Sequence, residues 1–264
     1  MANISQKKKS GGPRPPTTPP PPSPKALRIA RENGRLIGLT IVGTILSVAI
    51  AFYPLSPLLV TAPVVRPLLR RVRERDRAAV TGAFWRWALA AFLTILVSTA
   101  FVRDRVFSSF PLAPQAAHSM EQAIAGSGGA PFGLEVIVVG ILAFVGLAAA
   151  SLGIAACVLM SIALGTAAAA AAVLFTHGNN VLLVSLVACP PWLWALLAAA
   201  TLAFVPAVAV GGARWYQNGA ILLEEHEWFK RRAIIACGLV LLAVLLRLIL
   251  AGPYLNLIRY WTAM

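Results

Sequence analysis

Residues 134–175 read LEVIVVGILAFVGLAAASLGIAACVLMSIALGTAAAAAAVLF, and this stretch sets the class of the fold. It is almost entirely apolar and shows no alternation of polar and apolar residues, whereas the strands of a membrane barrel alternate at every second position. About 20 apolar residues cross the hydrocarbon of a bilayer as a helix. The stretch therefore predicts two consecutive transmembrane helices, over 134–155 and 156–175, either as a tight hairpin or with one of them tilted.

The whole chain shares this apolar character. Of its 264 residues, 59% are hydrophobic and 12% are charged, whereas a soluble domain is about 25% charged. A soluble protein of this composition would expose large apolar patches to water. Because backbone groups in lipid must be hydrogen-bonded internally, we expect residues 36–264 to form an all-α, polytopic transmembrane bundle of five or six spans. Proline-broken runs predict one or two re-entrant segments within it.

The first apolar run, residues 36–65, is broken by Pro54, Pro57 and Pro63 and is followed by an arginine cluster over 66–77. A single crossing would place that cluster outside, against the tendency of lysine and arginine to remain on the cytoplasmic side. We therefore predict a helix over 36–53, a turn near Pro54 and a short return to the cytoplasmic side.

The remaining layout follows from the same rule. Further spans are expected over 83–102 and 233–252. A further apolar region, 181–210, is too long for one crossing and contains Pro190 and Pro191. Trp85 and Trp87 are expected in an interfacial aromatic belt at the start of the second span. An external loop is expected over 103–133, with a short helix near 115–125, and cytoplasmic segments over 66–82 and 212–232. Most of the 23 lysines and arginines then lie on the cytoplasmic side with the N-terminus; the exceptions are Arg103, Arg105, Arg247 and Arg259.

The N-terminal residues 1–35 differ from the rest of the chain. They are rich in proline and basic residues and have almost no apolar residue before Ala26. Such a segment cannot bury a core, so we expect a disordered cytoplasmic arm with polyproline II character in its proline run. Residues 25–35 predict one or two turns of basic interfacial helix that enter the bilayer.

The basic residues of the arm and of the arginine cluster are the candidate functional residues. They predict contact with anionic lipid, with RNA or DNA through phosphate neutralisation, or, through the proline run, with an aromatic groove of a cytoplasmic partner. A plainer alternative is that they only fix the topology. The candidates are Lys7, Lys8, Lys9, Arg14, Lys25, Arg28, Arg31, Arg35, Arg66, Arg70, Arg71 and Arg73.

Small residues mark a candidate packing face in the stretch 134–155. Gly146, Ala150 and Gly153 fall near one face of a helix, and small residues let helix backbones approach closely in membranes. The face predicts packing within this chain or, alternatively, contact in a homo-oligomer.

The sequence contains no Gly-rich phosphate loop, no G-x-S-x-G elbow and no H-E-x-x-H motif. The acidic group at 224–227 includes His226 but lacks a second histidine, which favours a solvated face over a metal site. Arg247 lies inside a predicted span and is expected to reach the interface by snorkelling. We therefore expect a non-enzymatic membrane structural or assembly protein, with no cofactor and no identified small-molecule substrate. The alternative is a small permease or channel subunit.

Overall fold

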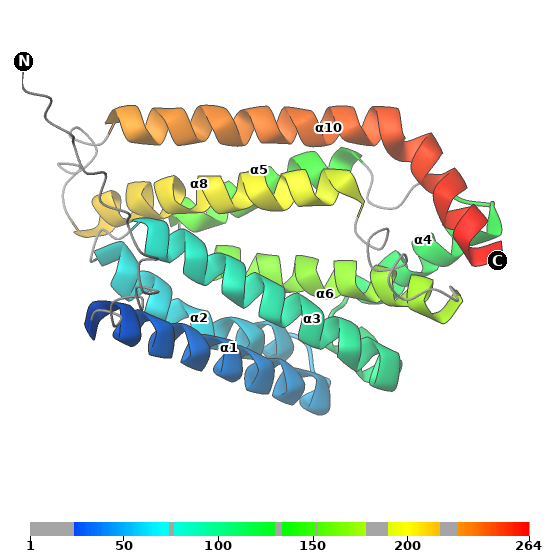
Figure 1. Ribbon diagram of the computed structural model, residues 1–264, viewed down its shortest axis with the longest axis horizontal. Helices are drawn as coiled ribbons and strands as arrows, with labels where there is room; N and C mark the ends of the chain where they lie inside the picture. Colours follow the sequence, from blue (N-terminus) through cyan, green and yellow to red (C-terminus); the bar gives the residue numbers. More distant parts are fainter. Residues whose placement is uncertain are drawn as a thin grey trace, which may run out of the picture.

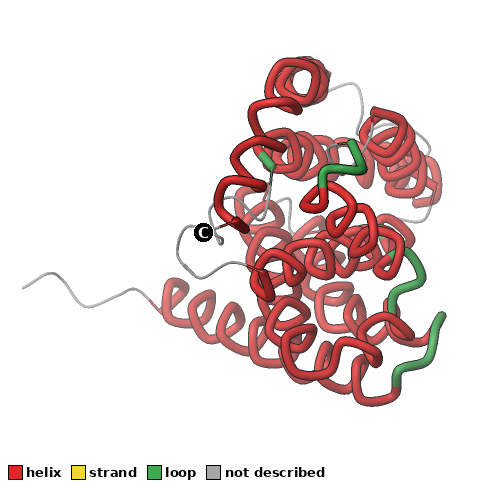
Figure 2. Tube along the Cα trace, turned by 90° about the vertical axis from the view of Figure 1, so that its right-hand side faces the viewer, coloured by secondary structure: helices red, strands yellow, loops and turns green. Residues whose placement is uncertain are grey.

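A computed structural model describes residues 24–73, 77–129, 134–150, 153–177, 190–216 and 226–263. Every regular element within these ranges is an α-helix, and most of the helices run along the long axis of the molecule (Figure 1). Viewed along that axis, the helices are seen nearly end on, as a bundle (Figure 2). Residues 1–23, which hold most of the predicted disordered arm, lie outside the described residues.

The helices of the described ranges are α1 (Pro24–Ile50), α2 (Leu55–Arg73), α3 (Arg77–Ser109), α4 (Ala113–Ala125), α5 (Leu134–Ala150), α6 (Ile154–His177), α8 (Pro191–Tyr216) and α10 (His226–Ala263). Five of these contain segments long and apolar enough to cross a membrane: Arg28–Ile50, Ala78–Ser109, Ile154–Phe175, Pro191–Val208 and Lys230–Tyr260. A shorter apolar segment, Val139–Ala150, lies in α5. The predicted all-α architecture with several candidate spans is confirmed at this level.

Helix α1 begins well before the predicted end of the arm. The arm was expected to extend to residue 35, with one or two helical turns over 25–35, and the structure places residues 24–50 in one continuous helix. Pro24 suits the first helical position because the N–H groups of a first turn have no partner within the helix. The interfacial turns expected over 25–35 therefore belong to the same helix as the first span.

A turn over residues 51–54 joins α1 to α2, and the two helices pack against each other. They approach most closely at Gly43, where an added Cβ would lie 2.7 Å from the carbonyl oxygen of Leu59. Pro63, four residues after Leu59, has no N–H to bond that oxygen. The proline inside α2 thus leaves a backbone oxygen facing the small residue of α1.

Helix α3 lies against α1, α2 and α6. Trp87, which was expected in an interfacial aromatic belt, is instead fully buried, so this prediction is wrong. The reason is that α2 returns alongside α3 and covers it. Phe84 of α3 also contacts Phe144 of α5 and Phe204 of α8, with ring centroids 6.2 and 4.9 Å away. Aromatic packing therefore joins helices from both halves of the chain.

The second span ends in a local break and not in a loop. Val102 has non-helical angles (φ −139°, ψ 54°), after which the helix resumes and runs to Ser109. The segment 103–133, predicted as a loop, therefore begins as helix. The short helix expected near 115–125 is α4, which ends at Gly126 with φ 82°, a left-handed conformation that glycine adopts without steric cost.

The apolar stretch 134–175 divides into two helices in mutual contact, α5 and α6. Gly153, with φ 87°, precedes α6. The alanine run of α6 faces the interior, where Ala168, Ala169, Ala170 and Ala171 are buried. Small side chains here let α6 approach neighbouring helices closely.

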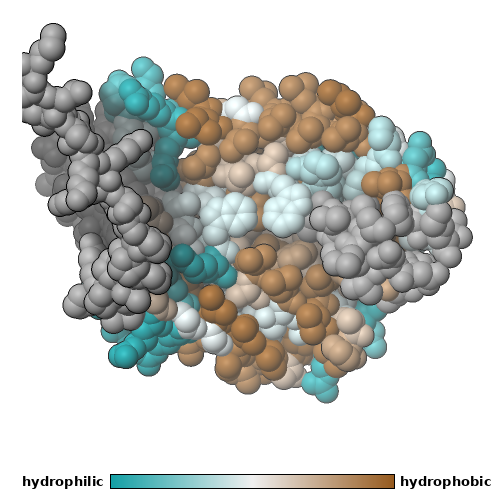
Figure 3. Space-filling model, viewed as in Figure 1, coloured by the Kyte–Doolittle hydropathy of each residue, from teal (hydrophilic) through white to brown (hydrophobic). Residues whose placement is uncertain are grey.

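Apolar side chains cover much of the middle of the face shown in Figure 3, and hydrophilic residues lie toward both ends of this face. On the face shown in Figure 3, hydrophilic residues gather at the end where α1 and α10 begin, and hydrophobic residues cover much of α10. Large apolar side chains of α10 are exposed, among them Leu241, Leu245, Leu248 and Ile249. An exposed apolar surface of this extent suits a helix that faces lipid.

Candidate functional site

Three segments that are distant in the sequence meet at one end of the bundle, which we call the basic end. The first segment is the start of α1. The second runs from the end of α2 into the start of α3, and the third is the start of α10. Arg71 of α2 contacts both Asn33 of α1 and the carbonyl oxygen of Ala79 of α3, and Arg232 of α10 donates to Thr81 of α3 at 3.4 Å. The segments 66–82 and 226–232, both predicted to be cytoplasmic, are therefore neighbours in space.

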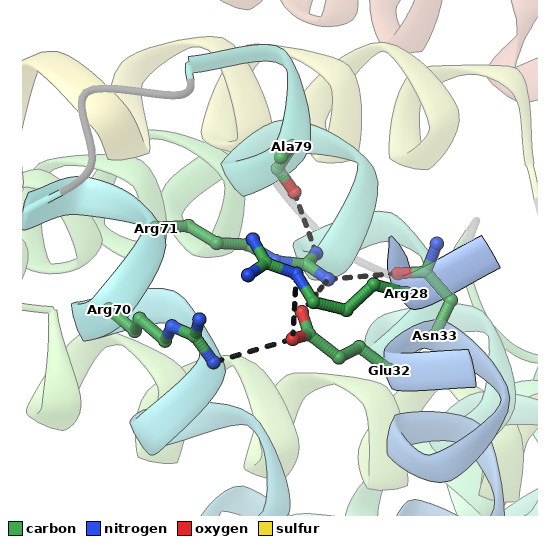
Figure 4. Close-up of polar contacts among 6 residues, drawn as sticks. All are labelled: Arg28, Glu32, Asn33, Arg70, Arg71 and Ala79. Carbon is green, nitrogen blue, oxygen red and sulfur yellow. Dashed lines mark hydrogen bonds and ion pairs between the residues drawn. The ribbon is translucent and has the colours of Figure 1, made fainter. Parts of the chain in front are cut away.

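Glu32 is the centre of the polar contacts at this end (Figure 4). Its carboxylate lies 3.9 Å from Nε of Arg28, 3.3 Å from a terminal nitrogen of Arg70 and 3.8 Å from one of Arg71. Arg28 lies one turn earlier on α1, a spacing at which oppositely charged side chains share a helix face, whereas Arg70 and Arg71 come from α2. One carboxylate therefore links the start of α1 to the end of α2.

Arg71 differs from its neighbour Arg70 in burial. The Arg71 side chain is only 6% exposed, whereas that of Arg70 is 52% exposed. The Arg71 guanidinium donates to Asn33 Oδ1 and to the Ala79 carbonyl oxygen, each at 3.0 Å. A buried charge requires such partners because its desolvation costs several kcal/mol. Arg71 of α2 thus connects α1 and α3 through buried hydrogen bonds. The side chain of Arg70 is exposed to solvent.

Helix α10 adds a second basic group to the same end. The Arg232 guanidinium lies over the Trp228 ring at 4.3 Å from its centroid, a geometry in which the ring attracts the cation. Lys230 and Arg231 beside it are exposed. Arg232 therefore anchors the start of α10 while the two neighbouring cations extend the positive surface.

The structure places the candidate basic residues in three groups. Lys7, Lys8, Lys9 and Arg14 lie outside the described residues. On α1, Lys25 lies in the first turn, and Arg28, Arg31 and Arg35 are exposed; on α2, Arg66 and Arg70 are exposed, Arg71 is buried and Arg73 is the last residue. Among the candidates whose side chains the structure describes, Arg28, Arg70 and Arg71 lie together around Glu32.

Glu32 and Asn33 were not selected from the sequence as site residues. Glu32 is the one acidic residue of the segment 1–35, a sign that it has a specific partner. Consecutive positions of a helix point about 100° apart. The sequence therefore offered no reason to expect that Glu32 and its neighbour Asn33 would both contact α2.

The small-residue face is only partly engaged within the chain. Gly153 is enclosed, since an added Cβ would lie 2.7 Å from Phe204 and 2.8 Å from Val208. Gly146 and Ala150 are exposed, and nothing lies within 4 Å of a Cβ added at Gly146. Of the three residues, Gly153 packs closely against described parts of the chain, and Gly146 and Ala150 remain candidates for contact in a homo-oligomer.

The opposite end of the bundle has its own, smaller set of polar contacts. Arg103 pairs with Glu121 of α4 at 2.6 Å, and Arg259 of α10 donates to the Ala123 carbonyl oxygen at 3.1 Å. Within the span of α10, the Arg247 guanidinium lies 5.3 Å from the centroid of the buried Trp192 ring. These arginines are thus engaged by α4 and α8.

In the part of the chain that the structure describes, no group of three His, Cys, Asp or Glu side chains is arranged to hold a metal ion. Glu224 and Glu225 lie outside that part, so the prediction for the acidic group at 224–227 falls outside the described residues. The chain matches no family model, and no curated protein or solved structure is significantly similar to it.

Proposed function

We propose that the chain is a non-enzymatic, multi-pass membrane structural or assembly protein whose basic end binds anionic lipid, nucleic acid or a cytoplasmic partner. The observation that carries this proposal is the convergence of basic residues from α1, α2 and α10 at one end of an otherwise apolar bundle. Cations placed beside membrane spans attract anionic headgroups electrostatically. We place this end, with the N-terminus, on the cytoplasmic side because basic segments are retained there.

In this proposal the α1–α2 hairpin is the re-entrant element. Both of its outer ends lie at the basic end, where Arg70 meets Glu32, and its turn at 51–54 lies at the far end of α1. Anionic lipid, nucleic acid and a cytoplasmic partner protein are the three candidate partners.

The test uses purified full-length protein in nanodiscs and a variant that lacks residues 1–23. Each nanodisc sample is titrated with fluorescent RNA and with vesicles of phosphatidylcholine with or without phosphatidic acid, at two salt concentrations. We expect binding to the anionic partner that weakens as salt rises, because exposed charges are screened. Equal binding to neutral and anionic vesicles, together with no RNA binding, would contradict the proposal.

A small permease or channel subunit is the second candidate. It is favoured by Arg247, which lies within the candidate span of α10, since charged residues at such positions often line a path for ions or substrates. The prolines inside helices, Pro63 and Pro67 in α2 and Pro206 in α8, suit discontinuous helices around a path. Flux across proteoliposomes that Arg247→Leu abolishes, and that the exposed Leu248→Ala leaves intact, would favour this function over the first.

A further inference from the structure

We infer that the start of α8 binds a small monovalent anion, which contacts the indole N–H of Trp192 and the guanidinium of Arg247. The inference goes beyond the function proposed for the basic end, because α8 begins at the opposite end of the bundle (Figure 1). It assigns a class of ligand to two side chains that lie together within the candidate spans of α8 and α10.

The indole N–H of Trp192 is a buried donor. The Trp192 side chain is fully buried in a cluster with residues of α4, α6 and α10, and its Nε1 atom has no hydrogen-bond partner among the described residues. A donor that loses water on burial and gains no acceptor is costly. Because phenylalanine would fill most of the same space without that cost, the N–H of Trp192 indicates that an acceptor binds here.

The backbone at the same place favours negative charge. Trp192 is the second residue of α8, a helix of 26 residues. The N–H groups of a first turn have no partner within their helix, and the helix dipole makes that end positive. The N–H of Leu193 bonds the carbonyl oxygen of Pro190 at 2.9 Å. The buried indole donor is therefore a second, independent sign of an acceptor at a helix end that suits anions.

Arg247 supplies positive charge beside this donor. Its guanidinium carbon lies 5.3 Å from the centroid of the Trp192 ring, and its side chain is half-buried. An arginine carries five N–H donors, so Arg247 can contact an anion while another of its donors bonds elsewhere. Away from water, the attraction between a cation and an anion is only weakly screened.

The acceptor of the Trp192 N–H is not a carboxylate of the neighbouring segments. Residues 136–223 and 228–264 contain no aspartate or glutamate. Glu121 of α4 pairs with Arg103 at 2.6 Å, and Arg259 of α10 donates to the Ala123 carbonyl oxygen. The acceptor therefore comes from another molecule.

The surroundings of Trp192 favour an anion that is small and carries one charge. The Trp192 ring packs edge-to-face against that of Tyr254, with centroids 5.1 Å apart, and lies in one apolar cluster with Ala117 and Ala171. None of these three neighbours carries a positive charge. Sulfate or a doubly charged phosphate would bring excess negative charge away from water at high cost. Chloride or a small carboxylate brings one charge, which matches that of Arg247.

The test measures chloride binding to the purified full-length protein in nanodiscs of phosphatidylcholine. Broadening of the chloride NMR signal reports binding, and sodium gluconate keeps the ionic strength constant. We expect bromide or acetate to compete with chloride and sulfate not to compete. Trp192→Phe and Arg247→Gln should each weaken chloride binding at least about tenfold, because each removes a hydrogen bond or a charge that the anion contacts.

The unfolding midpoint supplies a second measurement. A ligand that binds the folded state raises the midpoint, so chloride or acetate in place of gluconate should raise that of the wild type. The same exchange should leave the midpoint of Trp192→Phe unchanged, whatever the stability of this variant in gluconate. This comparison separates the loss of an anion site from a general loss of packing.

Matched controls come from the same two helices. Trp194 lies two residues after Trp192 and is 47% exposed, and Arg259 lies on α10 with Arg247. Trp194→Phe and Arg259→Gln should alter chloride affinity by no more than about twofold. Arg247→Lys retains the charge and should retain most of the binding that Arg247→Gln loses, a rescue that a purely structural role would not produce.

The outcomes divide clearly. Competition by bromide alone would identify a halide site, and competition by acetate would identify the carboxylate of a small acid as the ligand; both support the inference. Equal chloride and acetate effects in the wild type and in Trp192→Phe would overturn it. So would a wild type that responds to neither anion, or one that binds sulfate more tightly than chloride. Every variant retains the residues of the basic end, so these results leave the function proposed for that end unaffected.

Discussion

The indole N–H of Trp87 donates a hydrogen bond to the carbonyl oxygen of Val60 at 2.9 Å, which ties α3 to the middle of α2. Trp87 is fully buried and Val60 is fully buried beneath it. A backbone oxygen of one helix is thus bonded by a side chain of another, in a region without access to water. The α1–α2 hairpin is held to the bundle by a specific polar contact in addition to apolar packing.

Replacement of Trp87 by phenylalanine tests this contact. We expect Trp87→Phe to lower the free energy of unfolding by about 1–3 kcal/mol, because a buried donor is lost and part of the ring volume is left empty. Unfolding in denaturant, followed by circular dichroism, measures the change. Trp85→Phe is the control: Trp85 is only half-buried, and an equal loss there would show that the hydrogen bond is not the cause.

The close approach of α1 and α2 predicts opposite effects at two glycines of the same helix. Gly43→Ala should destabilise the protein by about 1–3 kcal/mol, since the new Cβ would meet the Leu59 carbonyl oxygen at 2.7 Å and the backbone would have to move. Gly38 has nothing within 4 Å, so Gly38→Ala should be neutral or stabilising by up to about 1 kcal/mol through helix propensity. Thermal unfolding measures the stability of both variants. An equal loss of stability in Gly43→Ala and Gly38→Ala would show that the close approach to Leu59 is not the cause.

Adjacent arginines of α2 should respond differently to the same change. Arg71→Gln should cost about 1–3 kcal/mol, because Asn33 and the Ala79 carbonyl lose a buried donor. Arg70→Gln should cost less than about 1 kcal/mol, as expected for an exposed ion pair. The readout is the unfolding midpoint in low salt and in high salt. Raised salt should reduce the small effect of Arg70→Gln and leave that of Arg71→Gln nearly unchanged.

The small residues of α5 and its C-terminal link provide a fourth prediction. Gly153→Ala should destabilise the protein by at least about 1–2 kcal/mol, because alanine is strained at φ 87° and its Cβ would lie within 2.9 Å of Phe204 and Val208. Gly146→Ala should leave stability unchanged or slightly higher.

Cross-linking tests separately whether Gly146 mediates contact between copies of the chain. If exposed Gly146 and Ala150 mediate contact between copies, Gly146→Leu should abolish a cross-linked dimer of the wild type without change in the unfolding midpoint, because close backbone approach needs small residues. A monomeric wild type, or a dimer that survives the substitution, would exclude this contact.

The sequence predicted features that depend on local chemistry. Pro54 marks the turn between α1 and α2, and the segment near 115–125 forms α4, because proline and helix propensity act within a few residues. Features that depend on distant neighbours were not predictable. Arg70 and Arg71 are chemically identical in the sequence, and only the arrival of Asn33 and Ala79 separates a buried arginine from an exposed one.

Trp87 and the small-residue face show the same limit. A tryptophan near the start of an apolar run is typical of an interface, and only the return of α2 beside α3 buries it. Gly146 and Gly153 both belong to the predicted face, but the helix ends between them, so the two do not share one continuous surface. The Glu32 contacts likewise required the hairpin that brings α2 back to the start of α1.

The hairpin of α1 and α2 also has a consequence for biosynthesis. Residues 36–65 contain no charged side chain, and the turn at 51–54 reads Ala-Phe-Tyr-Pro. Since transfer of a charged group to the bilayer centre costs about 2.5–3.5 kcal/mol on insertion scales, the absence of charge removes that cost from this stretch. Insertion of α1 and α2 into a bilayer would therefore require no charged group of this stretch to enter the hydrocarbon.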